Sequence, residues 1–182
     1  QLWPAQDQAA IELLDDFIGE KMAHYKTERD LPAVDGTSRL SPYLNIGILS
    51  IRQCMQTLFK DGYFQIDDIG QQTWLDELLW REFYLHTLFD FPRVSRHRPF
   101  KENTDNIQWR NAPDDLAAWQ QGQTGIPIVD AGMRQMRAIG WMHNRVRMIT
   151  AMFLCKNLLI DWRLGERWFM QYLIDGDLAA NN

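Results

Sequence analysis

The fold of this chain is constrained most strongly by apolar residues that recur at steps of three and four along almost its whole length. In residues 71–90 they cover most sides of a helix, which predicts a central helix. In residues 6–28 they line one face, which predicts an amphipathic helix. No segment alternates polar and apolar residues between turn signals, as a half-buried strand would. The sequence therefore predicts an all-α fold.

Further helices are expected over residues 50–59, 113–121, 127–139, 142–159 and 164–174. Ser50 is a suitable N-cap for the first of them. Pro113 begins the second and Gly122 ends it, as these residue types commonly do. Residues 91–111 carry few regular signals, which predicts a long loop.

The composition is that of a globular protein, since 46% of the 182 residues are hydrophobic and 24% are charged. No linker or repeat divides the chain, so residues 1–182 are predicted to form a single partial domain. Two cysteines are too few for a disulfide framework or a zinc cluster. The net charge of −5 argues against a simple electrostatic coat for DNA, although a local basic patch is compatible with it.

The two ends and the longest apolar run bear on location. That run, residues 148–160, is broken by Lys156 and is shorter than the roughly 20 residues of a membrane span. The first residues do not resemble a secretory signal, so we expect a cytoplasmic protein with no membrane partner. Residues 175–182 form a polar cluster without a terminal helix, which indicates a piece of a longer chain.

A first candidate site follows Gly36. Its hydroxyl, guanidinium and backbone N–H groups could hold an anion such as phosphate; the residues are Thr37, Ser38, Arg39, Leu40 and Ser41. The same segment could equally be a capped turn that leads into the next helix.

A second candidate site lies on the helix predicted for residues 71–90. Glu77, Trp80, Arg81 and Tyr84 are separated by three and four residues and share one face, which Trp74 extends by a turn. A carboxylate and a tryptophan on a buried helix would be costly unless they line a cavity. The alternative is an ion pair between Glu77 and Arg81 on a solvated face.

Two further groups lie near the end of the chain. Asn144, Arg147 and Met148 share a helix face that could open onto a pocket or an anion, or could be an ordinary helix start with solvated arginines. Asp175 and Asp177 flank a glycine without the ligand spacing of a calcium loop, so no metal is predicted. They could pair with Arg147 or accept hydrogen bonds from a ligand.

The ordered set of motifs DGTSRLSPYL, WLDELLWREFY, HRPF, TGIPIVDAGMRQM, GWMHNRVRM and IDWRLGERWF resembles the helical flavin-binding domain of the DNA photolyase and cryptochrome family. The resemblance runs from residue 25 to 182 and is greatest to the class I cyclobutane pyrimidine dimer photolyases. It implies FAD in a U shape inside a truncated helical domain. An antenna domain with folate or deazaflavin and further C-terminal helices would be missing, so we expect this chain alone to bind FAD weakly or not at all.

The resemblance also implies a role for individual residues. Contact with FAD is implied for Tyr25, Thr37, Ser38, Arg39, Leu40, Ser41, Trp74, Glu77, Arg81, Asn144, Arg147, Asp175, Asp177 and Asn181. Contact with a flipped-out pyrimidine dimer is implied for Glu77, Trp80, Asn144 and Met148. Arg29 and Arg145 match positions that contact DNA, and Trp109 and Trp162 match two members of a chain of tryptophans that reduces the flavin.

The function that the resemblance implies is light-driven repair of pyrimidine dimers in DNA, by an electron that passes from excited, reduced FAD to the dimer and back. We hypothesise that Glu77 is protonated there and donates a hydrogen bond to the charged dimer. The implied location is the cytoplasm or a bacterial nucleoid, with no obligate protein partner. The alternatives are a cryptochrome-type photoreceptor that signals through partners, and a helical binding module that has lost its flavin.

Overall fold

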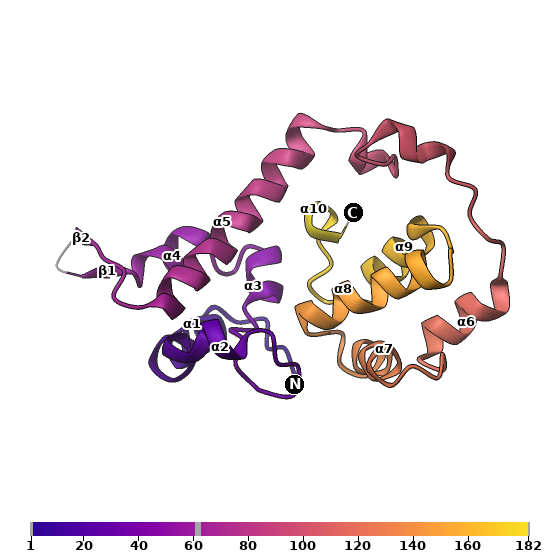
Figure 1. Ribbon diagram of the computed structural model, residues 1–182. Coiled ribbons are helices and arrows are strands. Elements are labelled where there is room, and N and C mark those ends of the chain that lie inside the picture. The colour runs from indigo at the N-terminus through magenta and orange to yellow at the C-terminus, as the bar shows by residue number, and fades with distance from the viewer. Residues whose placement is uncertain (1, 61–62, 182) are drawn as a thin grey trace. The chain divides into compact units, whose positions relative to one another are not determined.

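The computed structural model describes residues 2–60 and 63–181, and these residues are mainly helical (Figure 1). The predicted all-α class is confirmed. The chain divides after Phe83 into two compact units, which are described separately below. Whether residues 1–182 correspond to a single partial domain stays a prediction.

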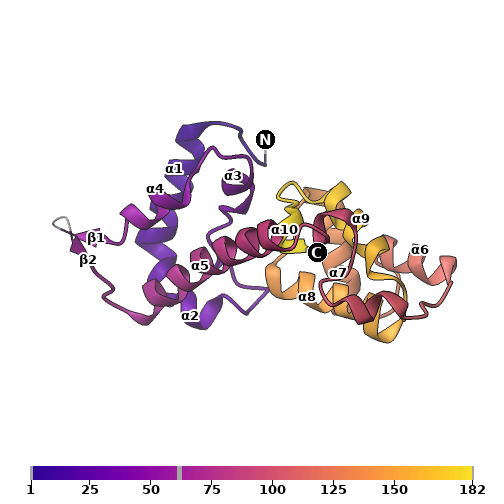
Figure 2. The ribbon, with the colours of Figure 1, turned by 90° about the horizontal axis from the view of Figure 1, so that it is seen from above.

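Unit 1 contains four short helices, a small hairpin and the first part of a long helix. Their bounds are α1 Asp7–Asp16, α2 Tyr25–Glu28, α3 Ser41–Asn45, α4 Ile51–Gln56, β1 Phe59–Lys60, β2 Tyr63–Phe64 and α5 Ile69–Asp90. The core lies between α1, α4 and the N-terminal half of α5, which Figure 2 shows along its length. Phe17 packs against Trp74 and Tyr25, with 5.4 Å between ring centroids in each case.

The helix predicted for residues 6–28 is interrupted. After α1, the chain makes a π-helical segment at Phe17–Lys21 and a 3-10 turn at Met22–His24 before α2 begins. The π segment bonds the backbone N–H of Met22 to the carbonyl of Phe17, five residues back, and both side chains are buried. A single extra residue in the turn thus keeps both apolar groups in the core.

Two other predictions for unit 1 need correction. The helix from Ser50 has the predicted N-cap, and a capping box with Gln53, but it ends at Gln56 because Phe59 pairs with Phe64 in the hairpin. The long helix α5 is buried only in its first half, whereas Trp80 and Phe83 are exposed. A helix that is apolar on all sides needs packing partners on all sides, and unit 1 covers only one of them.

Unit 2 is built from helices joined by short turns. Their bounds are α6 Pro113–Gln121, α7 Pro127–Ile139, α8 Asn144–Met152, α9 Trp162–Tyr172 and α10 Leu178–Asn181, with 3-10 turns at Val94–Arg96 and Glu102–Asn106 and a π segment at Phe153–Asn157. Trp119 is fully buried and bonds through Nε1 to the carbonyl of Thr150. Helices α7 and α8 pack closely because Gly132 leaves room for Val146.

Most of the helix ends predicted for unit 2 are confirmed. Gly122 and Gly140 adopt positive φ and end α6 and α7. Helix α8 begins at Asn144, two residues later than predicted, because the side chain of His143 caps it. The predicted absence of a terminal helix is wrong, since Asp177 accepts a hydrogen bond from the N–H of Ala179 at 2.9 Å and begins α10.

Residues 91–111 form a loop, as predicted, but one that is held by specific contacts. Arg163 donates to the carbonyl of His97 at 2.8 Å and to Asp105 at 2.6 Å. The backbone N–H of Arg110 donates to the carbonyl of Leu159 at 2.8 Å. None of the helices in the described chain is both long and apolar enough to cross a membrane. Nor do three or more metal-ligating side chains gather anywhere in residues 2–60 and 63–181.

Candidate cofactor and nucleic-acid site

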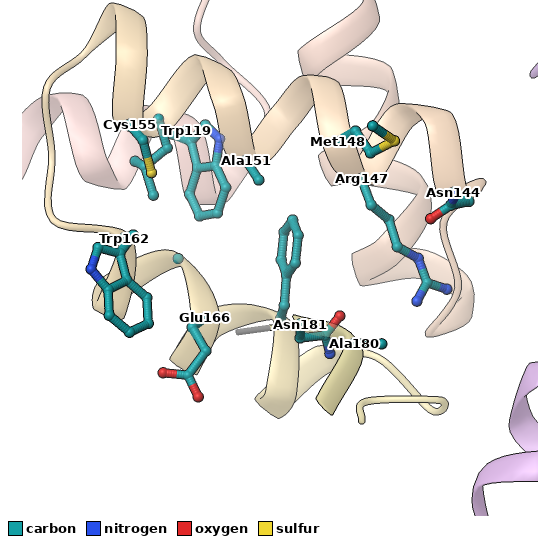
Figure 3. A pocket seen from close by; sticks show the side chains of 13 residues that line it. Trp119, Asn144, Arg147, Met148, Ala151, Cys155, Trp162, Glu166, Ala180 and Asn181 are labelled. Atoms are coloured by element: carbon teal, nitrogen blue, oxygen red, sulfur yellow. The ribbon is translucent and has the colours of Figure 1, made fainter. Parts of the chain in front are cut away.

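A pocket of about 380 Å³ lies within unit 2, between side chains of α8, α9 and α10 (Figure 3). It brings together five residues that the sequence singled out, Asn144, Arg147, Met148, Trp162 and Asn181. The remaining lining residues are Trp119, Ala151, Leu154, Cys155, Gly165, Glu166, Phe169 and Ala180. Residues predicted from separate motifs thus line one pocket.

Helical spacing explains how the walls form. Asn144, Arg147 and Met148 lie on one face of α8, at steps of three and four, and their side chains lie on the same wall in Figure 3. Trp162 and Glu166 are four residues apart on α9 and form the facing wall. A side chain caps the start of each helix. In α8 the side chain of His143 accepts a hydrogen bond from the backbone N–H of Arg145, and in α9 the side chain of Asp161 accepts one from the backbone N–H of Arg163.

Arg147 is held at the edge of the pocket by a buried carboxylate. Its Nη2 lies 2.9 and 2.7 Å from the two carboxylate oxygens of Asp175, and its Nε donates to the carbonyl of Met142 at 2.8 Å. The Asp175 side chain is 1% exposed and that of Arg147 is 17% exposed. A buried charge is stable only when it is paired and hydrogen-bonded, so these contacts fix the guanidinium in place.

A flavin ring is planar, apolar on its faces and polar at its edges, and a pocket that binds it must match these surfaces. Met148 and Ala151 supply accessible apolar surface, and Asn144 and Asn181 supply amides that can both donate and accept. Arg147 supplies a fixed positive charge for an anionic ring. The residues present therefore fit a flavin ring.

Three other predicted residues of unit 2 have different contacts. Asp177 caps α10. Arg145 places Nη1 3.5 Å from the sulfur of Met148, which lines the pocket. Trp109 is half-buried beside Arg110 and lies outside the described lining of the pocket.

Glu166 was not among the residues predicted from the sequence; it is buried in the pocket wall and lies 2.9 Å from Nδ1 of His97. The signal was available, because Glu166 lies at steps of four and three from Trp162 and Phe169 on one face of α9. Arg163 was not predicted either, and its guanidinium carbon lies 4.8 Å from the centre of the Trp162 ring.

In unit 1, Glu77 forms an ion pair with Arg29 and not with Arg81, the partner that helical spacing had offered as an alternative. Nη1 of Arg29 lies 2.5 Å from Oε1 of Glu77, while Nη2 of Arg81 donates to the carbonyl of Leu44. Burial opposes the charge of Arg29, but the hydrogen bond to Glu77 and nearby negative charge raise the pKa of this guanidinium overall. Arg29 also lies over the ring of Tyr25, and burial raises the pKa of that phenol to about 12.

The hydroxyl segment after Gly36, residues 37–41, has features of an anion site and of a turn that leads into a helix. Thr37 and Ser38 are half-buried, and Arg39 adopts a positive φ of 52° and pairs with Asp35 at 2.9 Å. A hydrogen bond from Lys21 holds the pKa of Asp35 below its usual range. Leu40, by contrast, is buried in the core and precedes α3, as in a turn that leads into a helix; Ser41 is its first, exposed residue.

The two tryptophans predicted on α5 differ in their surroundings. Trp74 is buried in the core of unit 1. Trp80 is 51% exposed and packs edge-to-face against Phe83, with 5.4 Å between ring centroids. An exposed indole next to the exposed side of Glu77 is a suitable stacking surface for a base.

Comparison with known proteins identifies the family. The family described as the FAD-binding domain of DNA photolyase matches residues 74–182. The chain belongs to this family. It is 54% identical over 180 residues to the deoxyribodipyrimidine photo-lyase of Escherichia coli (strain K12), an alignment that covers 99% of this chain and 38% of that relative.

Two solved structures extend this likeness to the fold of the photolyase family. A bacterial class III photolyase from Agrobacterium tumefaciens matches with a TM-score of 0.90 and 42% identity, over 98% of this chain and 37% of that one. A Synechocystis cryptochrome matches with a TM-score of 0.88 and 33% identity, over 98% and 38%. The family resemblance is thereby confirmed. The chain spans about 38% of the length of the curated photolyase that it matches.

Proposed function

We propose that this chain is the part of a DNA photolyase that binds FAD and the damaged DNA, and that the function is light-driven repair of cyclobutane pyrimidine dimers. The observation that carries the proposal is the convergence of Asn144, Arg147, Met148, Trp162 and Asn181 on one pocket that fits a flavin ring. Membership of the photolyase family supports it.

When bound, FAD would supply the electron that light transfers to the dimer and that returns after the ring of the dimer opens. Arg147 would stabilise negative charge on the flavin ring, and Asp175 would keep Arg147 in position. Asn144 and Asn181 would bind the polar edge of the flavin ring. Trp162, in the wall that faces Asn144, would be suitably placed to pass an electron to it.

Residues of unit 1 would bind the polar parts of the ligands. The hydroxyls of Thr37, Ser38 and Ser41 would bind phosphate. Trp80 would stack on the flipped-out bases, and Glu77 would hydrogen-bond their edges. The roles of Arg145 at DNA and of Trp109 in electron transfer stay predictions from the family resemblance.

Flavin binding is tested by titrating the purified chain with FAD and following the quenching of flavin fluorescence. We expect Arg147→Gln to weaken binding at least tenfold, whereas Arg137→Gln, which removes an exposed arginine on α7, serves as the matched control. Equal affinities of both variants and the wild type would rule out Arg147 as a flavin ligand.

Repair is tested with the chain in its full natural context. DNA that contains thymine dimers is incubated with the reduced protein in blue light and in the dark, and the remaining dimers are counted. Loss in light only supports repair. Similarity to the Synechocystis cryptochrome makes a photoreceptor the second candidate, and no loss of dimers despite bound, reduced flavin would favour it.

The proposed proton on Glu77 needs its own comparison. Glu77→Gln retains an N–H donor at this position and Glu77→Ala does not. We expect the repair yield per photon to fall further in Glu77→Ala. Equal losses would argue against a hydrogen bond donated by Glu77.

A further inference from the structure

Arg29 and Glu77 form an ion pair at the surface of unit 1, between α2 and α5. Nη1 of Arg29 and Oε1 of Glu77 are 2.5 Å apart, and the two side chains are 20% and 31% exposed. Asp30 is more distant, 3.9 Å from Nε. The group expected to meet a DNA phosphate is therefore bonded to the group expected to meet the damaged base.

A second anion can approach this pair without a large rearrangement. A guanidinium has five N–H donors, and in the part of unit 1 that the structure describes Nη2 of Arg29 has no acceptor. Phosphate matches the guanidinium fork at least as well as carboxylate does. The two side chains are partly exposed, so water and salt screen the pair and weaken it enough for the anion to be exchanged.

Tyr25 keeps the guanidinium in place whichever anion it binds. The Arg29 guanidinium carbon lies 5.5 Å from the centre of the Tyr25 ring, and the ring is buried in the core. The backbone N–H of Arg29 donates to the carbonyl of Tyr25 at 2.9 Å. Exchange of the anion therefore needs movement of the Glu77 side chain, not of α2.

We propose that Arg29 is a clasp on Glu77 that DNA opens: a backbone phosphate takes over the guanidinium, and the Glu77 carboxyl group becomes free to hydrogen-bond the base. Arg29 is thus a positioning residue for Glu77. This inference rests on the proposed function, because it requires that the protein binds DNA at this face. It couples binding of the DNA backbone to release of the group that recognises the lesion.

The test measures the affinity for an undamaged duplex by fluorescence anisotropy, using the chain in its full natural context. Removing the charge of Glu77 should release Arg29 for phosphate, so Glu77→Gln should tighten binding three- to tenfold. The slope of log K against log salt should stay the same, because phosphate contacts Arg29 in both bound proteins, whereas Arg29→Gln should reduce it by about 0.9, the value for one lost phosphate contact. Asp76→Asn is the matched control, because it removes one exposed carboxylate of α5 that bonds only within its own helix, to Gln72.

Variants of Arg29 separate the clasp from a general effect of charge. In an Arg29→Gln background, Glu77→Gln should no longer tighten binding. Arg29→Lys should restore most of the affinity that Arg29→Gln loses, because a lysine still contacts phosphate. If Arg29→Gln fails to fold, as judged by circular dichroism, the gain in affinity of Glu77→Gln over that of Asp76→Asn decides the question.

The possible failures are distinguishable. Binding by the wild type with no greater gain in Glu77→Gln than in Asp76→Asn overturns the clasp and leaves DNA binding intact. A gain that persists without Arg29 also overturns it. A wild-type protein that binds no duplex overturns the proposed function together with the clasp.

Discussion

The Arg147–Asp175 pair makes the stability of unit 2 depend strongly on one buried carboxylate. In Asp175→Asn, the charge of the side chain is lost and one of the two acceptor oxygens becomes an amide N–H group, which faces a guanidinium that can only donate. Arg147 would then remain as a largely buried charge without its counter-charge. We therefore expect a large loss of stability from a substitution that hardly changes volume.

The magnitude follows from the contacts. Removing one partner of a buried ion pair typically costs about 3–5 kcal/mol. Two features reduce the cost here, because Asn retains one acceptor and because Arg147 keeps its bond to Met142 and is 17% exposed to water. We expect the free energy of unfolding to fall by about 2–4 kcal/mol, at the lower end of what breaking a buried pair costs.

The assay is urea denaturation at pH 7, followed by tryptophan fluorescence and by circular dichroism. With a slope of about 2 kcal/mol per molar urea, the midpoint should fall by about 1–2 M. Asp177→Asn is the matched control, since asparagine caps a helix about as well as aspartate, and its midpoint should hardly change. Equal midpoints for the Asp175 variant and the wild type would refute the argument that this buried pair holds the pocket wall together.

Three further predictions test other parts of the chain. Burial opposes ionisation of Asp130, but hydrogen bonds from Thr124 and Gly125 lower the pKa of its carboxyl group overall. The ionised carboxylate therefore stabilises the fold at neutral pH, and this stabilisation is lost as the carboxylate is protonated in acid. The urea midpoint of the wild type should fall as the pH drops below about 4, and that of Asp130→Asn should fall less steeply. Gly132→Ala should lower the free energy of unfolding by about 1–3 kcal/mol despite the higher helix propensity of alanine, because its Cβ would lie 2.3 Å from a Val146 methyl group; a thermal melt that rises would contradict this. Burial raises the pKa of the Cys54 thiol to about 11, so alkylation at pH 8, followed by mass spectrometry, should be at least tenfold slower in the native protein than in urea.

The sequence predicted the fold well where the determinants are local. Residues 127–139 are helical as expected, because a proline begins the helix and Gly140 ends it by adopting positive φ. The end of α4 was wrong because the pairing of Phe59 with Phe64 outweighs local helix propensity. The π segment at residues 17–21 was missed because it depends on how Phe17 and Met22 meet the core, which no local pattern records.

The candidate site was predictable as a set of residues but not as a set of contacts. Steps of three and four place Asn144, Arg147 and Met148 on one face, and the structure places that face in the pocket. Arg29 and Glu77, in contrast, are 48 residues apart in the sequence. Periodicity predicts which residues lie on the same face of one helix. The Arg29–Glu77 pair depends instead on how two helices pack together, which periodicity does not predict.

Burial separates the two ion pairs at the candidate sites. The side chain of Asp175 is 1% exposed, so the attraction to Arg147 acts in a medium of low dielectric constant and an ion from solvent cannot replace it. The side chain of Glu77 is 31% exposed, so its pair with Arg29 is screened by water and salt and can exchange its anion. In the proposed function, a fixed charge would suit a residue that stabilises a bound flavin ring through each cycle of light absorption. An exchangeable pair would suit a surface that binds and releases DNA.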